Sequence, residues 1–428
     1  MTDATKRFYC RTGFVLGCLL PTLVVGLWIV ARCTPTYAVQ QQTQWQRAIG
    51  QTLGLMARIE RVEEPRPGAY VLHNVVLIDP DAAADAAPLL HAKRLELAHG
   101  PTGLIILATE ADAPTASLPR LWAVLHERLV RGPELAQAAL HLNLYSLTLT
   151  APSEATTRSL TLSDVRLQLL SAASGTRGQI EFRLAGEAGE PARISISRNR
   201  TKQPVATEWS LHSGATPLPC FALAPCAPAL RGFGEEATFH GVVTVQTYDQ
   251  TWNATLGAAF RHVNLDALVS EQFDHKLSGS ADLIFTDARW TAGRLTQASG
   301  TLQAHGGSVS QSLLEAATQQ LGLIASQRAS DPRRPPITTY TELAFGFSLD
   351  GLNMRLVGQL TDAQGMLVGA REEQLLSPVA LLRTLVPRGD VQVPAVAEVL
   401  PVLHMLPLTT NEPVGTERPR YRQVRLQD

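Results

Sequence analysis

Apolar and polar residues alternate along most of this 428-residue chain. The alternation is regular in Tyr70–Ile78, Leu277–Phe285 and Tyr340–Leu349, and residues that favour turns separate many such segments. Because successive side chains of a β-strand point to opposite faces, a period of two predicts strands with one apolar face. The segments do not alternate regularly with helical ones, as they would in an α/β fold. The sequence therefore predicts a mainly β chain with an antiparallel sheet.

The alternation changes phase inside two of the strand segments. Alternating leucines up to Leu144 are followed by Leu147 in the opposite phase, and Leu162 is followed in the same way by Val165. One inserted residue moves all following side chains of a strand to its other face. We therefore expect a β-bulge or a short turn at each of these positions.

The pair Asp350-Gly351 is the clearest local signal for a hairpin. It lies between two alternating segments, Tyr340–Leu349 and Leu352–Leu360. An Asp-Gly pair favours a two-residue type I′ loop, because both central residues of that loop need a positive φ. The sequence predicts an antiparallel hairpin with Asp350 and Gly351 as its loop.

Helical segments interrupt the strands at a few places, where apolar residues recur every three or four positions. These segments are residues 38–59, Leu118–Val130 and Ser308–Leu323. Ser308 or Ser310 can cap the last of them, and Gly322 suits its C-terminal end. Residues 217–234 (PLPCFALAPCAPALRGFG) also break the alternation and predict short helices.

Residues Gly13–Ala31 form an uncharged apolar run. As a helix rising 1.5 Å per residue, the run reaches roughly 28 Å, close to the ~30 Å hydrocarbon core of a bilayer. The cations Lys6, Arg7 and Arg11 precede it. Only Arg32 follows it closely, and this asymmetry favours a cytoplasmic N-terminus. The run predicts a single-pass membrane anchor with the rest of the chain on the far side.

A cleaved signal peptide and a lipoprotein signal are the alternatives to an anchor. A cleaved signal peptide has an apolar region of about 7–15 residues that ends at a small-residue cleavage site. The run is longer, and Arg32 does not suit such a site. Val15-Leu16-Gly17-Cys18 resembles a lipidation box, but the apolar stretch continues to Ala31. An uncleaved anchor fits these residues best.

These patterns divide the chain into consecutive parts. We expect a cytoplasmic N-terminus at 1–12, the anchor at 13–31, a juxtamembrane helix and linker at 32–68, a first β-rich half at 69–216, the helical insertion at 217–234, a second β-rich half at 235–408 that contains the helix 308–323, and a polar C-terminal tail at 409–428. Single hydrophobic cores stop growing near about 250–300 residues, so the part after the anchor has room for one large core or two modest ones.

Charge and cysteine content restrict the function. Lys and Arg together number 37 and Asp and Glu 38, so no basic surface predicts a nucleic-acid partner. Cys220 and Cys226 lie in the insertion, on the side of the membrane predicted to be oxidising. There they could form a disulfide that closes a short loop. The alternative is a pair of buried thiols, because a helix would hold residues six apart on different faces.

No motif predicts catalysis or cofactor binding. The chain has no Gly-rich phosphate loop, no His-Glu-x-x-His and no nucleophile elbow. The histidines are scattered, and the ones on predicted strands are His73, His141, His240 and His262. Asp282 and Asp287 flank a strand, where solvated carboxylates are expected rather than an acid–base pair. We expect no enzyme, no metal site and no cofactor.

Two segments of the chain resemble the AsmA-like family of envelope proteins. The first is the anchor together with residues 47–100, where the matching pieces are Val75-Val76-Leu77-Ile78-Asp79-Pro80 and Pro88-Leu89-Leu90-His91-Ala92. The second is residues 263–317, where Leu265-Asp266-Ala267-Leu268 and LSGSADL at 277–283 lead through a Gly-rich hairpin into a short helix. The middle of the chain resembles the family only in its succession of strands.

This resemblance implies a protein of the bacterial inner membrane that projects an elongated, curled antiparallel β-sheet with a few short helices into the periplasm. Such proteins are similar to bridge-like lipid carriers, so it also implies a role in cell-envelope and outer-membrane biogenesis, with a phospholipid as cargo in an apolar groove. The residues that could line this groove are Leu277, Leu283, Phe285, Leu295, Leu302, Phe345 and Phe347. The alternative is a scaffold with a filled core that assembles unidentified envelope proteins, because a period of two does not distinguish an open groove from a core.

Overall fold

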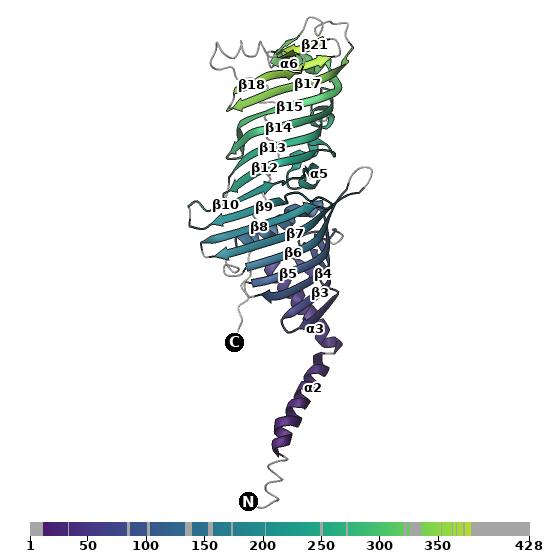
Figure 1. Cartoon of the computed structure of the whole chain (residues 1–428), viewed down its shortest axis with the longest axis vertical. Helices are drawn as coiled ribbons and strands as arrows, with labels where there is room; N and C mark the ends of the chain where they lie inside the picture. The colour runs from purple at the N-terminus through teal and green to yellow at the C-terminus, as the bar shows by residue number, and fades with distance from the viewer. Residues whose placement is uncertain are drawn as a thin grey trace, which may run out of the picture. The chain divides into compact units, whose positions relative to one another are not determined.

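The computed structural model describes residues 12–32, 34–83, 86–100, 103–132, 139–152, 157–172, 174–201, 203–248, 251–270, 273–320, 323–325, 335–351, 353–361, 363–364, 366–370 and 373–377. The chain divides into two compact units: unit 1 is Met1–Leu218 with Gln246–Asp249, and unit 2 is Pro219–Val245 with Gln250–Asp428. The sheet is open, curled and mostly antiparallel, and the helices are few and mostly short (Figure 1). The predicted mainly β fold class is confirmed. The predicted tail at 409–428 and Gly322 lie outside the described residues.

Unit 1 begins with helices and continues as a series of strands. Its helices are the π-helix η1 (Val15–Leu19), α2 (Leu20–Arg32), α3 (Pro35–Leu53), the 3-10 helix η2 (Thr115–Ser117), α4 (Leu118–Val124) and the π-helix η3 (Leu125–Val130). Its strands are β1 (Met56–Arg58), β2 (Arg61–Arg66), β3 (Ala69–Ile78), β4 (Leu90–Gly100), β5 (Gly103–Pro114), β6 (Ala139–Ala151), β7 (Arg158–Ala172), β8 (Gly175–Leu184), β9 (Ala192–Asn199) and β10 (Ala206–His212). The strands β11 (Leu218–Pro219) and β12 (Thr238–Thr247) have residues in both units.

One pair of strands in unit 1 is parallel. Antiparallel pairs run from β3 through β4 to β5, and from β6 through β7, β8 and β9 to β10. β5 and β6, in contrast, are parallel. Parallel neighbours need a crossover connection, and α4 with η3 provides it. We call Leu118–Val130 the crossover helix; the sequence predicted this helix but not the parallel pair that requires it.

The long helix α3 packs on the apolar face of the unit 1 sheet. Trp45 and Ile49 contact a buried cluster that contains Leu72. The helix was predicted to extend over 38–59 but ends at Leu53, because Gly54 takes a left-handed φ of 70° and its N–H bonds to the Gly50 carbonyl. The chain then enters β1 instead of continuing the helix.

The predicted phase changes are confirmed in β6 and β7. Leu144 and Leu149 are buried, whereas Tyr145 between the two phases is 75% exposed. In β7, Asp164 has a φ of 51°, and the register to β8 shifts between Ser163 and Arg166. The extra residue therefore lets both halves of each strand direct their apolar side chains to the same face.

Unit 2 contains most of the remaining strands and short helices. Its helices are α5 (Cys220–Leu223), the 3-10 helix η4 (Pro228–Phe233), the π-helix η5 (Asp266–Ser270) and α6 (Gln311–Gln320). Its strands are β13 (Trp252–Asn264), β14 (Leu277–Thr291), β15 (Arg294–Ser310), β16 (Ile324–Ala325), β17 (Ile337–Asp350), β18 (Asn353–Leu360), β19 (Ala363–Gln364), β20 (Val368–Ala370) and β21 (Glu373–Ser377). Antiparallel pairs join β13, β14, β15, β17 and β18 in that order. The short helices predicted for 217–234 are confirmed as α5 and η4.

Two predicted elements of unit 2 begin or end at other residues. The hairpin forms, but Asp350 pairs with Asn353, so the connection starts at Gly351, whose φ is 59°. The helix predicted at Ser308 starts at Gln311, because β15 continues to Ser310. The Ser310 hydroxyl accepts the Leu313 N–H at 3.3 Å, so Ser310 is the predicted cap.

The predicted anchor region is helical. Residues 12–32 form one continuous helical trace, in which η1 leads directly into α2. Large apolar side chains of this trace are exposed, from 45% for Val15 to 61% for Phe14. Among the helices that the structure describes, none is both long and apolar enough by itself to span a membrane.

Candidate functional site

The unit 2 sheet has one apolar face. On β14, Ala281, Leu283 and Phe285 are buried, and the residues between them, such as Ile284, are exposed. The same alternation continues on the neighbouring strands: in β18, Leu356 and Leu360 are buried and Val357 is 43% exposed. We call the side of Leu283 the apolar face and the side of Ile284 the outer face.

Strand register brings most of the predicted groove residues together on the apolar face. Leu283 pairs with Leu302, and Leu302 pairs with Phe345 of β17. At the next position of the same face, two residues along each strand, Phe285 of β14 and Phe347 of β17 both pair with Gly300 of β15. The two other predicted residues lie apart from this group. Leu277 pairs with Val309 at the start of β14, and Leu295 pairs with Trp290 near its end.

Phenylalanine rings form a continuous row across the apolar face. Phe285 contacts Phe347 with ring centroids 5.5 Å apart and Phe260 at 6.1 Å. Phe260 in turn contacts Phe239 at 5.5 Å and Phe233 at 5.0 Å. Most of these pairs are edge-to-face, the arrangement that the ring quadrupole favours. Phe233, Phe239 and Phe260 were not among the predicted groove residues, although Phe239 and Phe260 lie in segments with the strand period.

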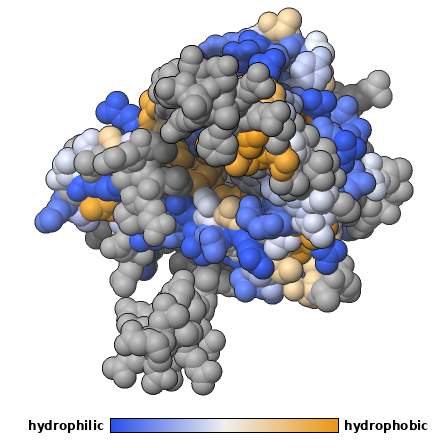
Figure 2. Space-filling model, turned by 90° about the horizontal axis from the view of Figure 1, so that it is seen from below, coloured by the Kyte–Doolittle hydropathy of each residue, from blue (hydrophilic) through white to orange (hydrophobic). Residues whose placement is uncertain are grey.

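The apolar face is only partly covered by the chain itself. Leu283, Phe285 and Leu295 are 9%, 3% and 4% exposed, whereas Leu277, Leu302, Phe345 and Phe347 are half-buried. Leu314 of α6 belongs to the buried cluster against which Leu302, Phe345 and Phe347 pack. Seen from below, the space-filling view shows separate hydrophobic areas between hydrophilic ones on this side of the molecule (Figure 2). The predicted residues thus include both core positions and positions that remain accessible.

Cys220 and Cys226 are free thiols in the structure. Cys220 is buried in α5, and burial raises the pKa of its thiol to about 12. Cys226 has exposed surface, yet burial of its sulfur also raises the pKa of that thiol. The structure therefore forms neither the disulfide nor a pair of fully buried thiols, and neither sulfur has the lowered pKa of a reactive thiolate.

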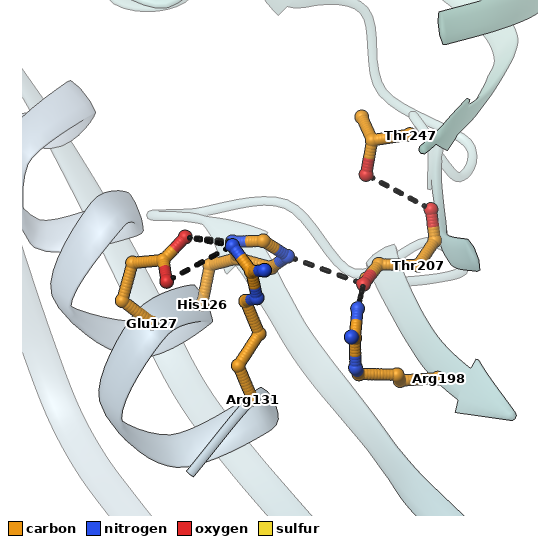
Figure 3. A network of polar contacts seen from close by, with 6 residues as sticks. All are labelled: His126, Glu127, Arg131, Arg198, Thr207 and Thr247. Atoms are coloured by element: carbon orange, nitrogen blue, oxygen red, sulfur yellow. Dashed lines mark hydrogen bonds and ion pairs between the residues drawn. The ribbon is translucent and has the colours of Figure 1, made fainter. Parts of the chain in front are cut away.

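Unit 1 contains a network of polar contacts around His126 that was not predicted from the sequence (Figure 3). His126 of η3 lies between Glu127, whose Oε1 is 3.1 Å from Nδ1, and Thr207 of β10, whose hydroxyl is 3.2 Å from Nε2. Arg198 of β9 donates to the same hydroxyl at 2.8 Å, and Arg131 donates to Glu127 at 3.1 Å. No motif marks these residues, because register and the crossover bring them together.

Asp282, Asp287 and His73 have structural contacts. Asp282 accepts the His262 N–H at 3.3 Å, and Asp287 pairs with Arg289 at 3.0 Å. His73 lies 3.5 Å from a Glu63 oxygen. Among the described residues, no group of three or more His, Cys, Asp or Glu side chains could hold a metal ion. A cavity of 10 Å³ beside Phe182 and Leu218 has room for about one water molecule.

Comparison with models of protein families and with curated proteins gives no match to this chain.

Proposed function

We propose that this chain is a membrane-anchored protein of the AsmA-like type, held in the bacterial inner membrane with its sheet in the periplasm. It would act in cell-envelope biogenesis by binding acyl chains of phospholipid on the apolar face of unit 2. The half-buried side chains of Leu302, Phe345 and Phe347 carry this proposal. Large apolar groups that stay accessible beside a buried row are typical of surfaces that bind an apolar ligand or partner.

The residue pattern of the N-terminus supports the anchor. Residues 12–32 are helical, and the side chains of Leu23 and Val24 are 54% and 55% exposed. Exposed apolar side chains around a helix are costly in water and favourable in lipid.

A second function is supported by a different observation. Leu283, Phe285 and Leu295 are buried by unit 2 itself, as in an ordinary core. A filled core would make this chain a scaffold for envelope partners, without a lipid cargo. The two functions differ in whether lipid occupies the half-buried part of the apolar face.

Lipid bound to the purified full-length chain distinguishes the two functions. We expect phospholipid to co-purify in mild detergent and to be detected by mass spectrometry. The double variant Leu302→Ser/Phe345→Ser, which changes one cross-strand pair of the apolar face, is expected to retain several-fold less lipid than the unchanged chain, because the apolar contact surface is lost.

The matched control is Ile284→Ser/Val357→Ser on the outer face. It accounts for lipid that co-purifies because it surrounds the anchor. Those side chains are 45% and 43% exposed, and the variant keeps the same N-terminus. It is expected to retain as much lipid as the unchanged chain. Equal lipid in all three proteins, or none in any of them, would contradict lipid binding and favour the scaffold.

The anchor has its own test. After an alkaline carbonate wash, the full-length chain is expected to stay in the membrane pellet. Leu23→Arg with Val24→Arg is expected to prevent stable insertion, since each Arg at the centre of a spanning helix costs about 2.5–3.5 kcal/mol. A released chain whose N-terminus lies near Thr34 would show cleavage instead of anchoring.

A further inference from the structure

The crossover helix covers part of the apolar face of the unit 1 sheet. Leu129 and Val130 are buried with Leu169 and Ile196 of the strands. Trp122 packs against the same cluster and meets Trp209 edge-to-face, with ring centroids 5.8 Å apart. At the start of the helix, Leu118 packs against a second buried cluster of the sheet. Removing this helix would expose the apolar side chains that it covers.

Polar contacts hold both ends of the crossover helix to the strands. Near its start, Ser117 donates to the Leu89 carbonyl at 2.8 Å, and Arg120 pairs with Asp79 at 2.7 Å. At its end, the Thr176 hydroxyl donates to the Val130 carbonyl at 3.2 Å. His126 supplies a further contact between these ends, to Thr207 of β10.

The partners of His126 determine where its proton lies. A carboxylate only accepts hydrogen bonds, so Nδ1 carries a hydrogen that it donates to Glu127. In the neutral ring, Nε2 is then an acceptor. The Thr207 hydroxyl accepts from Arg198 and is free to donate its own hydrogen to Nε2. Every group in this chain of contacts has a suitable donor or acceptor only while His126 is neutral.

Protonation of Nε2 removes this match. The Thr207 oxygen has two lone pairs and could then accept from both the ring and Arg198, but its own hydrogen would lose Nε2 as an acceptor, and the charged ring would face the Arg198 guanidinium. The charged groups around the ring are Glu127 and Arg131 from its own helix and Arg198 from β9. Glu208, next to Thr207, bonds to Gln246 and belongs to the opposite strand face. Burial lowers the pKa of His126 from 6.5, and the two arginines lower it further against the opposing effect of Glu127.

We propose that the contact between His126 and Thr207 holds the crossover helix in a pH-sensitive way: protonation at Nε2 weakens this contact and makes opening of this helix from the unit 1 sheet more frequent. The inference depends only on unit 1, so it holds or fails independently of lipid binding in unit 2.

The direction of the pH effect follows from linkage. The folded-state pKa of His126 is depressed, so the stabilising effect of neutral His126 is fully present above pH 6.5 and is lost as the pH falls through the lowered folded-state pKa. Between the two pKa values, opening is expected to rise up to about tenfold per pH unit.

Hydrogen–deuterium exchange of the full-length chain in detergent tests the proposed role of the His126–Thr207 contact. Peptides covering 118–131 are compared at pH 7.5 and at pH 5.5, with labelling times scaled for intrinsic exchange, and peptides from β14 and β15 serve as the reference. We expect protection of the crossover helix to fall on acidification while the reference is unchanged. In His126→Gln, which stays neutral and can still accept from Thr207, this fall is expected to disappear.

A second variant covers the case in which His126→Gln does not fold. Thr207→Val keeps the shape of a side chain that is 1% exposed but removes the hydroxyl that opposes protonation. Because the contact with His126 is then absent at every pH, protection of the crossover helix is expected to be lower already at pH 7.5 and to fall less on acidification. The same fall in protection on acidification in the unchanged chain and in either variant would overturn the proposal.

Discussion

Phe285→Asp is expected to lower the free energy of unfolding of unit 2 by at least about 3 kcal/mol. Phe285 is 3% exposed and lies in the row of rings between Phe260 and Phe347. A carboxylate at this position would lose water without gaining a partner, and the two ring contacts would be lost as well. Urea unfolding of the full-length chain, followed by tryptophan fluorescence, measures the effect, because Trp252 and Trp290 belong to unit 2.

Ile284→Asp is the matched control for this prediction. Ile284 is the preceding residue of the same strand, but it is on the outer face and 45% exposed. A carboxylate there keeps its water, so a loss of less than about 1 kcal/mol is expected. If Phe285→Asp unfolds like the unchanged chain but retains less lipid, the apolar face is open even at this buried position. An equal loss in both variants would show that the effect comes from the strand and not from the face.

The sequence pattern identified faces but not what covers them. Leu283 and Leu302 have the same alternation and are direct cross-strand partners, yet Leu283 is buried and Leu302 is half-buried. The difference depends on the tertiary packing around each residue, and no local period reports it. The division into a core part and an accessible part of the site therefore required the structure.

Other differences have equally specific causes. A helical period continued past Gly54, but a left-handed glycine ended the helix at Leu53. The parallel pair β5–β6 was not predicted, because alternation is the same in parallel and antiparallel strands. His126, Arg198 and Thr207 are far apart in the chain, and only strand register brings them into one network. The strands themselves were predictable, since their period of two follows directly from one buried face.

Gly300→Ala is expected to destabilise unit 2 by about 3 kcal/mol, although it adds only one methyl group. Gly300 lies on β15 between Phe285 and Phe347. A Cβ atom there would be 2.0 Å from the Ile284 carbonyl oxygen and 2.7 Å from Cζ of Phe347. The ring could turn away, but the carbonyl belongs to the backbone of β14, so the two strands would have to separate.

Gly257→Ala in β13 tests whether this cost comes from the close approach and not from the loss of a glycine. An added Cβ at Gly257 meets only the Thr286 carbonyl oxygen, at 3.6 Å, an ordinary contact. This variant is expected to be unchanged or more stable by about 0.4–1 kcal/mol, because alanine restricts the unfolded chain. The two variants add the same atom to the same sheet. A urea midpoint that falls only for Gly300→Ala therefore assigns the loss to the close approach of Gly300 to the Ile284 carbonyl. If Gly300→Ala instead unfolds like Gly257→Ala, the strands can separate at little cost, and the row of phenylalanines does not depend on their close approach.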